Sequence, residues 1–108
     1  MTDFGQLPEN FQQYQQQFPE MFAAYTKGAE AARASGPLDT KMTHLVQLGA
    51  AIGIRSEGAV RSHARRALEA GASHEELFQV INLSISTIGF PAAAAAYSWI
   101  RDMDRPKK

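Results

Sequence analysis

Apolar side chains recur three or four positions apart along most of this chain, and this helical spacing limits the fold more than any other feature. Helix-ending signals interrupt the pattern at Ser35-Gly36-Pro37, at Gly71 and at Gly89. No stretch alternates strictly between apolar and polar residues, as a half-buried strand would. The sequence therefore predicts an all-α, single-domain bundle of about six helices.

Several polar residues stand where a helix should begin. Asp39 or Thr40 can cap a helix that is apolar nearly all round, which we expect to be buried. Ser56 can cap the amphipathic helix that follows, and Ser73 with Glu76 has the spacing of a capping box. The helix after Ser56 is predicted to turn His63 inward.

Composition excludes several classes of function. The chain has 11 basic and 11 acidic residues, so it has no net field that would attract nucleic acid or an anionic membrane. It contains no cysteine, which removes disulfides and thiol chemistry. No apolar run reaches the roughly 18 residues of a membrane span, and no secretory signal is recognisable. We therefore expect a cytoplasmic protein.

Three parts of the chain differ in character. Residues 1–37 form an aromatic, glutamine-rich segment that we expect to be a helical arm, with Pro8 in a first turn. Residues 38–103 contain most of the aliphatic residues and should form the core domain. Residues 104–108 are charged and are predicted to be a flexible tail. The aromatic residues of the arm should cover the core or a neighbouring subunit.

Three motifs within residues 38–97 resemble the carboxymuconolactone decarboxylase and alkylhydroperoxidase-D-like family. They are Leu38-Asp39-Thr40-Lys41, the run from Ser56 to His63, and Gly89-Phe90-Pro91-Ala92-Ala93. The resemblance implies an alkylhydroperoxidase-D-like helical bundle. It also implies self-association, as a homotrimer or a homohexamer built from trimers, with the site near subunit contacts.

The redox-active branch of that family uses a Cys-x-x-Cys-x-x-x-His motif and a glutamate one helix earlier. The corresponding positions here are Ser56, Ala59, His63 and, for the glutamate, His44. Serine cannot cycle through a disulfide, so a peroxidase or disulfide reductase function fails on chemistry. An alkylhydroperoxidase-type antioxidant role is left as a third alternative that the missing cysteines disfavour.

The decarboxylase branch lacks the cysteines and keeps the histidine, and Val60-Arg61-Ser62-His63 resembles its pattern. The acidic residue expected just before this motif is Ala59 here, and Glu57 lies on a different side of the helix. The resemblance implies a cofactor-independent decarboxylase-like lyase acting on a small lactone or keto acid. The alternative is a non-catalytic oligomer that kept the fold and lost the Glu/Cys/Cys relay.

Four residues are candidates for the site. His63 can serve as a proton donor or base, and His44 as its partner if the two face each other. Two histidines are too few for a structural zinc site, so we expect neither metal nor cofactor. Arg55 and Ser56 precede a helix N-terminus and can bind the carboxylate of a small ligand. Alternatively, Ser56 only caps the helix and Arg55 points to water.

Overall fold

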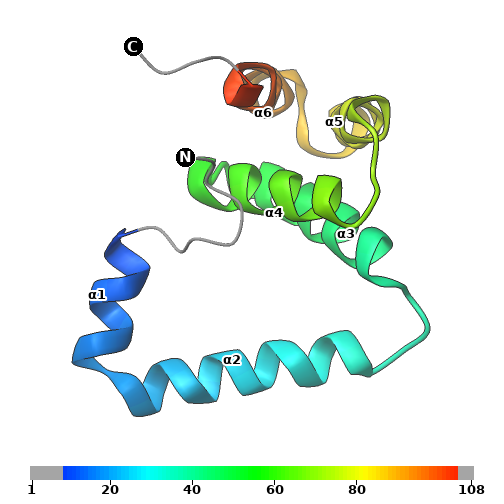
Figure 1. Cartoon of the computed structure of the whole chain (residues 1–108). Helices are drawn as coiled ribbons and strands as arrows, with labels where there is room; N and C mark the ends of the chain where they lie inside the picture. The colour runs from blue at the N-terminus through cyan, green and yellow to red at the C-terminus, as the bar shows by residue number, and fades with distance from the viewer. Residues whose placement is uncertain (1–8, 105–108) are drawn as a thin grey trace. The chain divides into compact units, whose positions relative to one another are not determined.

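The computed structural model describes residues 9–104, which form six α-helices and a short 3-10 turn without any strand (Figure 1). The all-α prediction is therefore confirmed. The helices are α1 (Glu9–Gln17), α2 (Pro19–Ala34), α3 (Thr40–Gly53), α4 (Glu57–Glu69), α5 (His74–Ile88) and α6 (Phe90–Arg101), and the turn η1 is Asp102–Asp104. The chain divides into two compact units, Met1–Leu38 and Asp39–Lys108.

The first unit consists of α1 and α2, and α2 has Pro19 in its first turn. Aromatic rings form a continuous row along these two helices. The ring centroids of Tyr14 and Phe18 are 5.1 Å apart, and those of Phe22 and Tyr25 are 5.8 Å apart. Neither helix contains a buried residue. The expected helix start at Pro8 lies outside the described residues.

The second unit consists of two helical hairpins, α3–α4 and α5–α6, which pack against each other (Figure 1). Small residues on α4 and α6 let the helices approach closely. The core of the unit is formed by Leu45, Leu48, Ala51, Ile52, Val60, Ala64, Ala67, Ala72, Leu77, Ile81, Ala92, Ala93, Ala96 and Ile100. All of these core residues therefore belong to the second unit.

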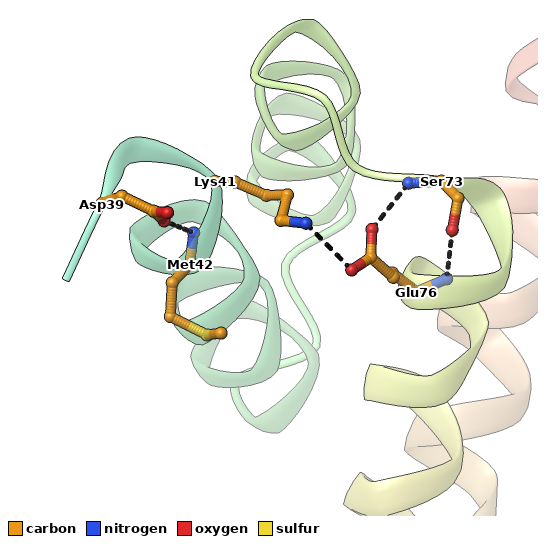
Figure 2. Close-up of polar contacts among 5 residues, drawn as sticks. All are labelled: Asp39, Lys41, Met42, Ser73 and Glu76. Atoms are coloured by element: carbon orange, nitrogen blue, oxygen red, sulfur yellow. Dashed lines mark hydrogen bonds and ion pairs between the residues drawn. The ribbon is translucent and has the colours of Figure 1, made fainter.

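The predicted caps are present, and one of them is tied to a neighbouring helix. The Asp39 carboxylate accepts a hydrogen bond of 2.8 Å from the Met42 backbone N–H, so Asp39 is the cap and Thr40 begins α3. Ser73 and Glu76 form the capping box of α5. Glu76 also accepts a 3.1 Å hydrogen bond from Lys41 Nζ (Figure 2). This ion pair joins the start of α3 to the start of α5.

Helix α3 is not buried all round, contrary to the prediction. Its sides toward α4 and α5 are covered, but Val46 is 55% exposed and Met42 is 42% exposed. On α5, Ile85 and Ile88 are likewise exposed. Within the second unit, the two hairpins leave the outer side of α3 and α5 without a covering helix.

An open groove of about 510 Å³ lies between α3 and α5, and apolar side chains dominate it. Its lining includes Met42, Val46, Gly49, Val80, Leu83 and Ile88. Within the described part of the chain, no helix is both long and apolar enough to cross a bilayer. Of the predicted tail, Asp104 ends the 3-10 turn, and the remaining residues lie outside the described range.

Candidate functional site

The turn between α3 and α4 places Arg55 in a conformation that normally favours glycine. The Ser56 N–H donates to the Ala51 carbonyl over 3.2 Å, a bond that spans five residues and closes the end of α3. Arg55 occupies the left-handed position of this turn, with φ of 54°. The equivalent position after α4 is Gly71, with φ of 103°. Arginine in this position costs about 1–2 kcal/mol of backbone strain.

Ser56 caps α4, as predicted, because its hydroxyl accepts a 3.3 Å hydrogen bond from the Ala59 N–H. The Arg55 side chain is exposed and makes no ion pair with another described residue. A guanidinium therefore stands in solvent beside the positive end of a helix dipole. Both features favour an anion at this end of α4.

His44 and His63 meet across the α3–α4 hairpin. Their Nδ1 atoms are 3.2 Å apart, which is hydrogen-bonding distance, and their ring planes are inclined by 34°. His44 is buried and His63 is partly buried. Two neutral imidazoles can make this contact when one Nδ1 carries its proton and the other accepts it. The pair therefore contains a proton that either ring can hold.

The surroundings of His63 disfavour its charged form. Burial lowers the pKa of His63 from 6.5 to about 4, with further lowering from the nearby positive charges of His44 and Arg66. A glutamate in place of His44 would act in the opposite direction, because a negative charge stabilises imidazolium. Burial, His44 and Arg66 therefore all favour the neutral imidazole of His63 at pH 7.

Gln47 lies one helical turn after His44 on α3, and sequence reasoning missed it. Its Oε1 atom is buried and has no hydrogen-bond partner within residues 9–104. Residues three apart on a helix are neighbours on one face, so Gln47 extends the polar face that His44 begins. The available sequence signal was a single amide among the apolar residues of α3.

The structure brings two of the four predicted site residues into contact and separates the other two from them. Ser56 and His63 lie seven residues apart on α4, which corresponds to roughly 10 Å along the helix axis. Arg55 and Ser56 therefore lie about two helical turns away from the histidine pair. On α3, Gln47 lies between His44 and the turn that contains Arg55.

The described residues contain no group of three or more His, Cys, Asp or Glu side chains able to hold a metal ion. His74, the remaining histidine, is exposed at the start of α5. The chemistry that this arrangement can perform is proton transfer by the pair together with anion binding at the start of α4.

Comparison with protein-family models gives a match to the Carboxymuconolactone decarboxylase family over residues 19–102. The match covers most of the chain and extends from α2 to the end of α6. Comparison with curated proteins gave no match. The absence of cysteine from the chain agrees with a member that lacks the redox pair.

Proposed function

Because the chain belongs to the carboxymuconolactone decarboxylase family, we propose that it is a cofactor-independent decarboxylase acting on a small lactone or keto acid. The observation that carries the proposal is the His44–His63 contact of 3.2 Å between Nδ1 atoms. It gives a cysteine-free chain a pair of groups that can hold and pass a proton. In this role His63 is the proton donor or base and His44 is its partner.

The reaction needs one proton for each carboxylate that it removes. The bond between the carboxylate and the neighbouring carbon breaks, carbon dioxide leaves, and the electron pair is delocalised into the adjacent carbonyl as an enolate. The protonated pair then gives a proton to the enolate carbon and recovers one from water. A bound carboxylate beside His63 favours this step, because its negative charge raises the lowered pKa of the histidine.

The other end of the site supports binding of a second carboxylate. Arg55 and the start of α4 offer a guanidinium and free backbone N–H groups, and they lie roughly 10 Å along the axis from His63. An elongated acid with a carboxylate at each end fits this separation, whereas an acid of three or four carbons would reach only one end. The strain at Arg55 supports the same role, since strained residues concentrate at functional sites.

Carbon dioxide release from a panel of muconolactone-type lactones and β-keto acids tests the proposal. Purified protein should release carbon dioxide from at least one of them, and His63→Ala should abolish that release. His74→Ala is the matched control, because it removes an exposed histidine at the start of α5. A wild-type rate equal to that of His63→Ala on every compound would contradict the proposal and favour a non-catalytic oligomer.

We propose also that the chain assembles with copies of itself, as a homotrimer or homohexamer. Two apolar surfaces support this proposal. In the first unit, Tyr14, Phe18, Met21 and Tyr25 are each at least 44% exposed. In the second unit, Val46 and Leu83 stand 55% and 67% exposed at the α3–α5 groove. Light scattering coupled to size-exclusion chromatography should give three or six times the monomer mass, and a monomer would contradict the assembly.

A further inference from the structure

One face of α2 is apolar along the whole helix. Its residues recur three or four positions apart, so on a helix they lie within an arc of about 100°. They are Phe18 at the N-cap, Met21, Phe22, Tyr25, Ala29 and Ala32. The charged residues Glu20 and Lys27 lie on the opposite side of the helix. No residue of α2 is buried, so this face has the pattern of a packed helix but lacks a covering surface in the first unit.

The groove between α3 and α5 has a length and a lining that suit this face. Along α5 it extends from Glu76 to Ile88, roughly 18 Å, and the α2 face from Phe18 to Ala32 is roughly 21 Å long. Gly49 lines the groove without a side chain. A small residue at such a position lets a further helix approach closely. The groove can therefore hold one helix along its length.

Charges do not oppose this packing. Among the described residues that line the groove, Glu76 alone is charged, and it pairs with Lys41 over 3.1 Å (Figure 2). On α2, Glu20 and Lys27 lie opposite the apolar face, so they would stay in solvent. No unpaired charge is therefore buried when the apolar face of α2 lies in the groove.

The exposed apolar area is sufficient for a stable contact between two copies. The exposed fractions are 44–65% for Phe18, Met21 and Tyr25 of α2 and 42–67% for Met42, Val46 and Leu83 of the groove. Large side chains have about 150–250 Å² of surface each, so either set offers roughly 300 Å². Two copies that exchange α2 would bury roughly 1,200 Å², which reaches the range of stable protein interfaces.

We propose that two copies of the chain exchange their α2 helices, so that the apolar face of α2 in each copy lies in the α3–α5 groove of the other. The exchange covers both apolar surfaces with one kind of contact, whereas two grooves packed together would leave the α2 face uncovered. Docking of α2 within its own chain would remove the apolar area on which assembly depends. Reciprocal exchange needs a twofold axis, which a homohexamer of two trimers contains and a homotrimer lacks. The inference rests on the self-assembly proposed above and not on the reaction.

Disulfide formation tests the contact, because the chain has no cysteine of its own. Met21→Cys and Tyr25→Cys place thiols on adjacent turns of the α2 face, and Leu83→Cys places one in the groove. Each α2 variant is coexpressed with Leu83→Cys, purified, oxidised in glutathione buffer and analysed by mass spectrometry. At least one pair should give the mixed disulfide as its main product. Lys27→Cys, on the opposite side of α2, should give about tenfold less of it.

Other products would identify other occupants of the groove and overturn the proposal. A homodimer of Leu83→Cys as the main product would show that two grooves pack together. An intrachain disulfide in the double variant Tyr25→Cys/Leu83→Cys would show that α2 lies on its own chain. A multimeric protein without the mixed disulfide would contradict the exchange and retain the assembly, whereas a monomeric wild type would contradict both.

Light scattering gives a second measurement on the same surfaces. The wild type should have six times the monomer mass, and a trimeric mass would contradict reciprocal exchange. Tyr25→Glu and Leu83→Glu should each lower the mass at least about twofold, because each buries an unpaired charge in the contact. Both positions are exposed within the chain, so circular dichroism should show unchanged helix content. Lys27→Glu should leave the mass unchanged, and an unchanged mass in the other two variants would overturn the proposal.

Discussion

His44 Nδ1 lies 3.2 Å from His63 Nδ1, so the two histidines share one hydrogen bond between neighbouring helices. By the sequence resemblance, the redox members of the family are expected to have a glutamate and a histidine at these two positions. A glutamate at position 44 would stabilise a protonated His63. A histidine there instead disfavours a second positive charge once one of the two rings is protonated. Burial and the nearby positive charges therefore favour the neutral form of His63 at pH 7.

The lowered pKa of His63 predicts how stability depends on pH. Its pKa is about 4 in the folded protein against 6.5 in the reference state, so the unfolded chain binds more protons between these values. The free energy of unfolding should therefore have its full value above pH 6.5 and fall as the pH decreases toward 4. The loss from this group should be about 2 kcal/mol, after allowance for its partial exposure.

Urea unfolding at a series of pH values measures this dependence, with His63→Gln for comparison. The difference in unfolding free energy between wild type and variant should change steadily from pH 6.5 to 4 and remain constant above pH 7. A difference that does not vary with pH would show that His63 titrates normally.

Arg55→Gly should stabilise the protein and weaken ligand binding. Glycine relieves the left-handed strain at φ of 54°, which should raise the free energy of unfolding by about 1 kcal/mol. The same change removes the guanidinium proposed to bind a carboxylate, so the dissociation constant of hexanedioate should increase about tenfold. Urea unfolding and NMR titration measure the two effects.

Gly71→Ala is the control for the strain argument, because Gly71 is in the equivalent turn with φ of 103°. It should destabilise the chain and leave ligand binding intact. An Arg55→Gly protein with wild-type ligand affinity would remove Arg55 from the site.

Ser73→Ala should destabilise the second unit by about 1 kcal/mol. The Ser73 hydroxyl accepts from the Glu76 N–H over 3.1 Å, and the Glu76 carboxylate accepts from the Ser73 N–H over 2.9 Å (Figure 2). These hydrogen bonds, together with Lys41, lower the pKa of Glu76. Ser62→Ala, in the middle of α4, is the control and should change stability by less than about 0.5 kcal/mol. Equal unfolding free energies for the two variants would contradict the role of the capping box.

Local chemistry was sufficient to predict the helix boundaries. Ser56 and Ser73 cap because their side chains reach backbone N–H groups only three residues away, and that spacing is visible in the sequence. The exposure of Val46 was not predictable, because it depends on which sides of α3 the other hairpin covers. The spacing of apolar residues identifies a buried helix but does not show how many neighbours it has.

The candidate site could be predicted only in part, for a related reason. The sequence identifies His44 and His63 as candidates because they are histidines on apolar helix faces. The α3–α4 hairpin brings them together. Their separation from Ser56 by two helical turns is also implicit in the sequence. The sequence does not show that the Gln47 oxygen is buried and unpaired, because the burial and partners of one amide depend on tertiary packing.

The most direct test of the account is a double-mutant cycle of His44→Phe and His63→Phe on carbon dioxide release from the best substrate of the panel. If the two rings act as one proton-transferring unit, each single variant should lose nearly as much activity as the double variant. Their effects on the activation free energy would then be strongly non-additive. Additive effects, or a single variant with wild-type turnover, would contradict the account, because independent histidines do not form the pair that the structure shows.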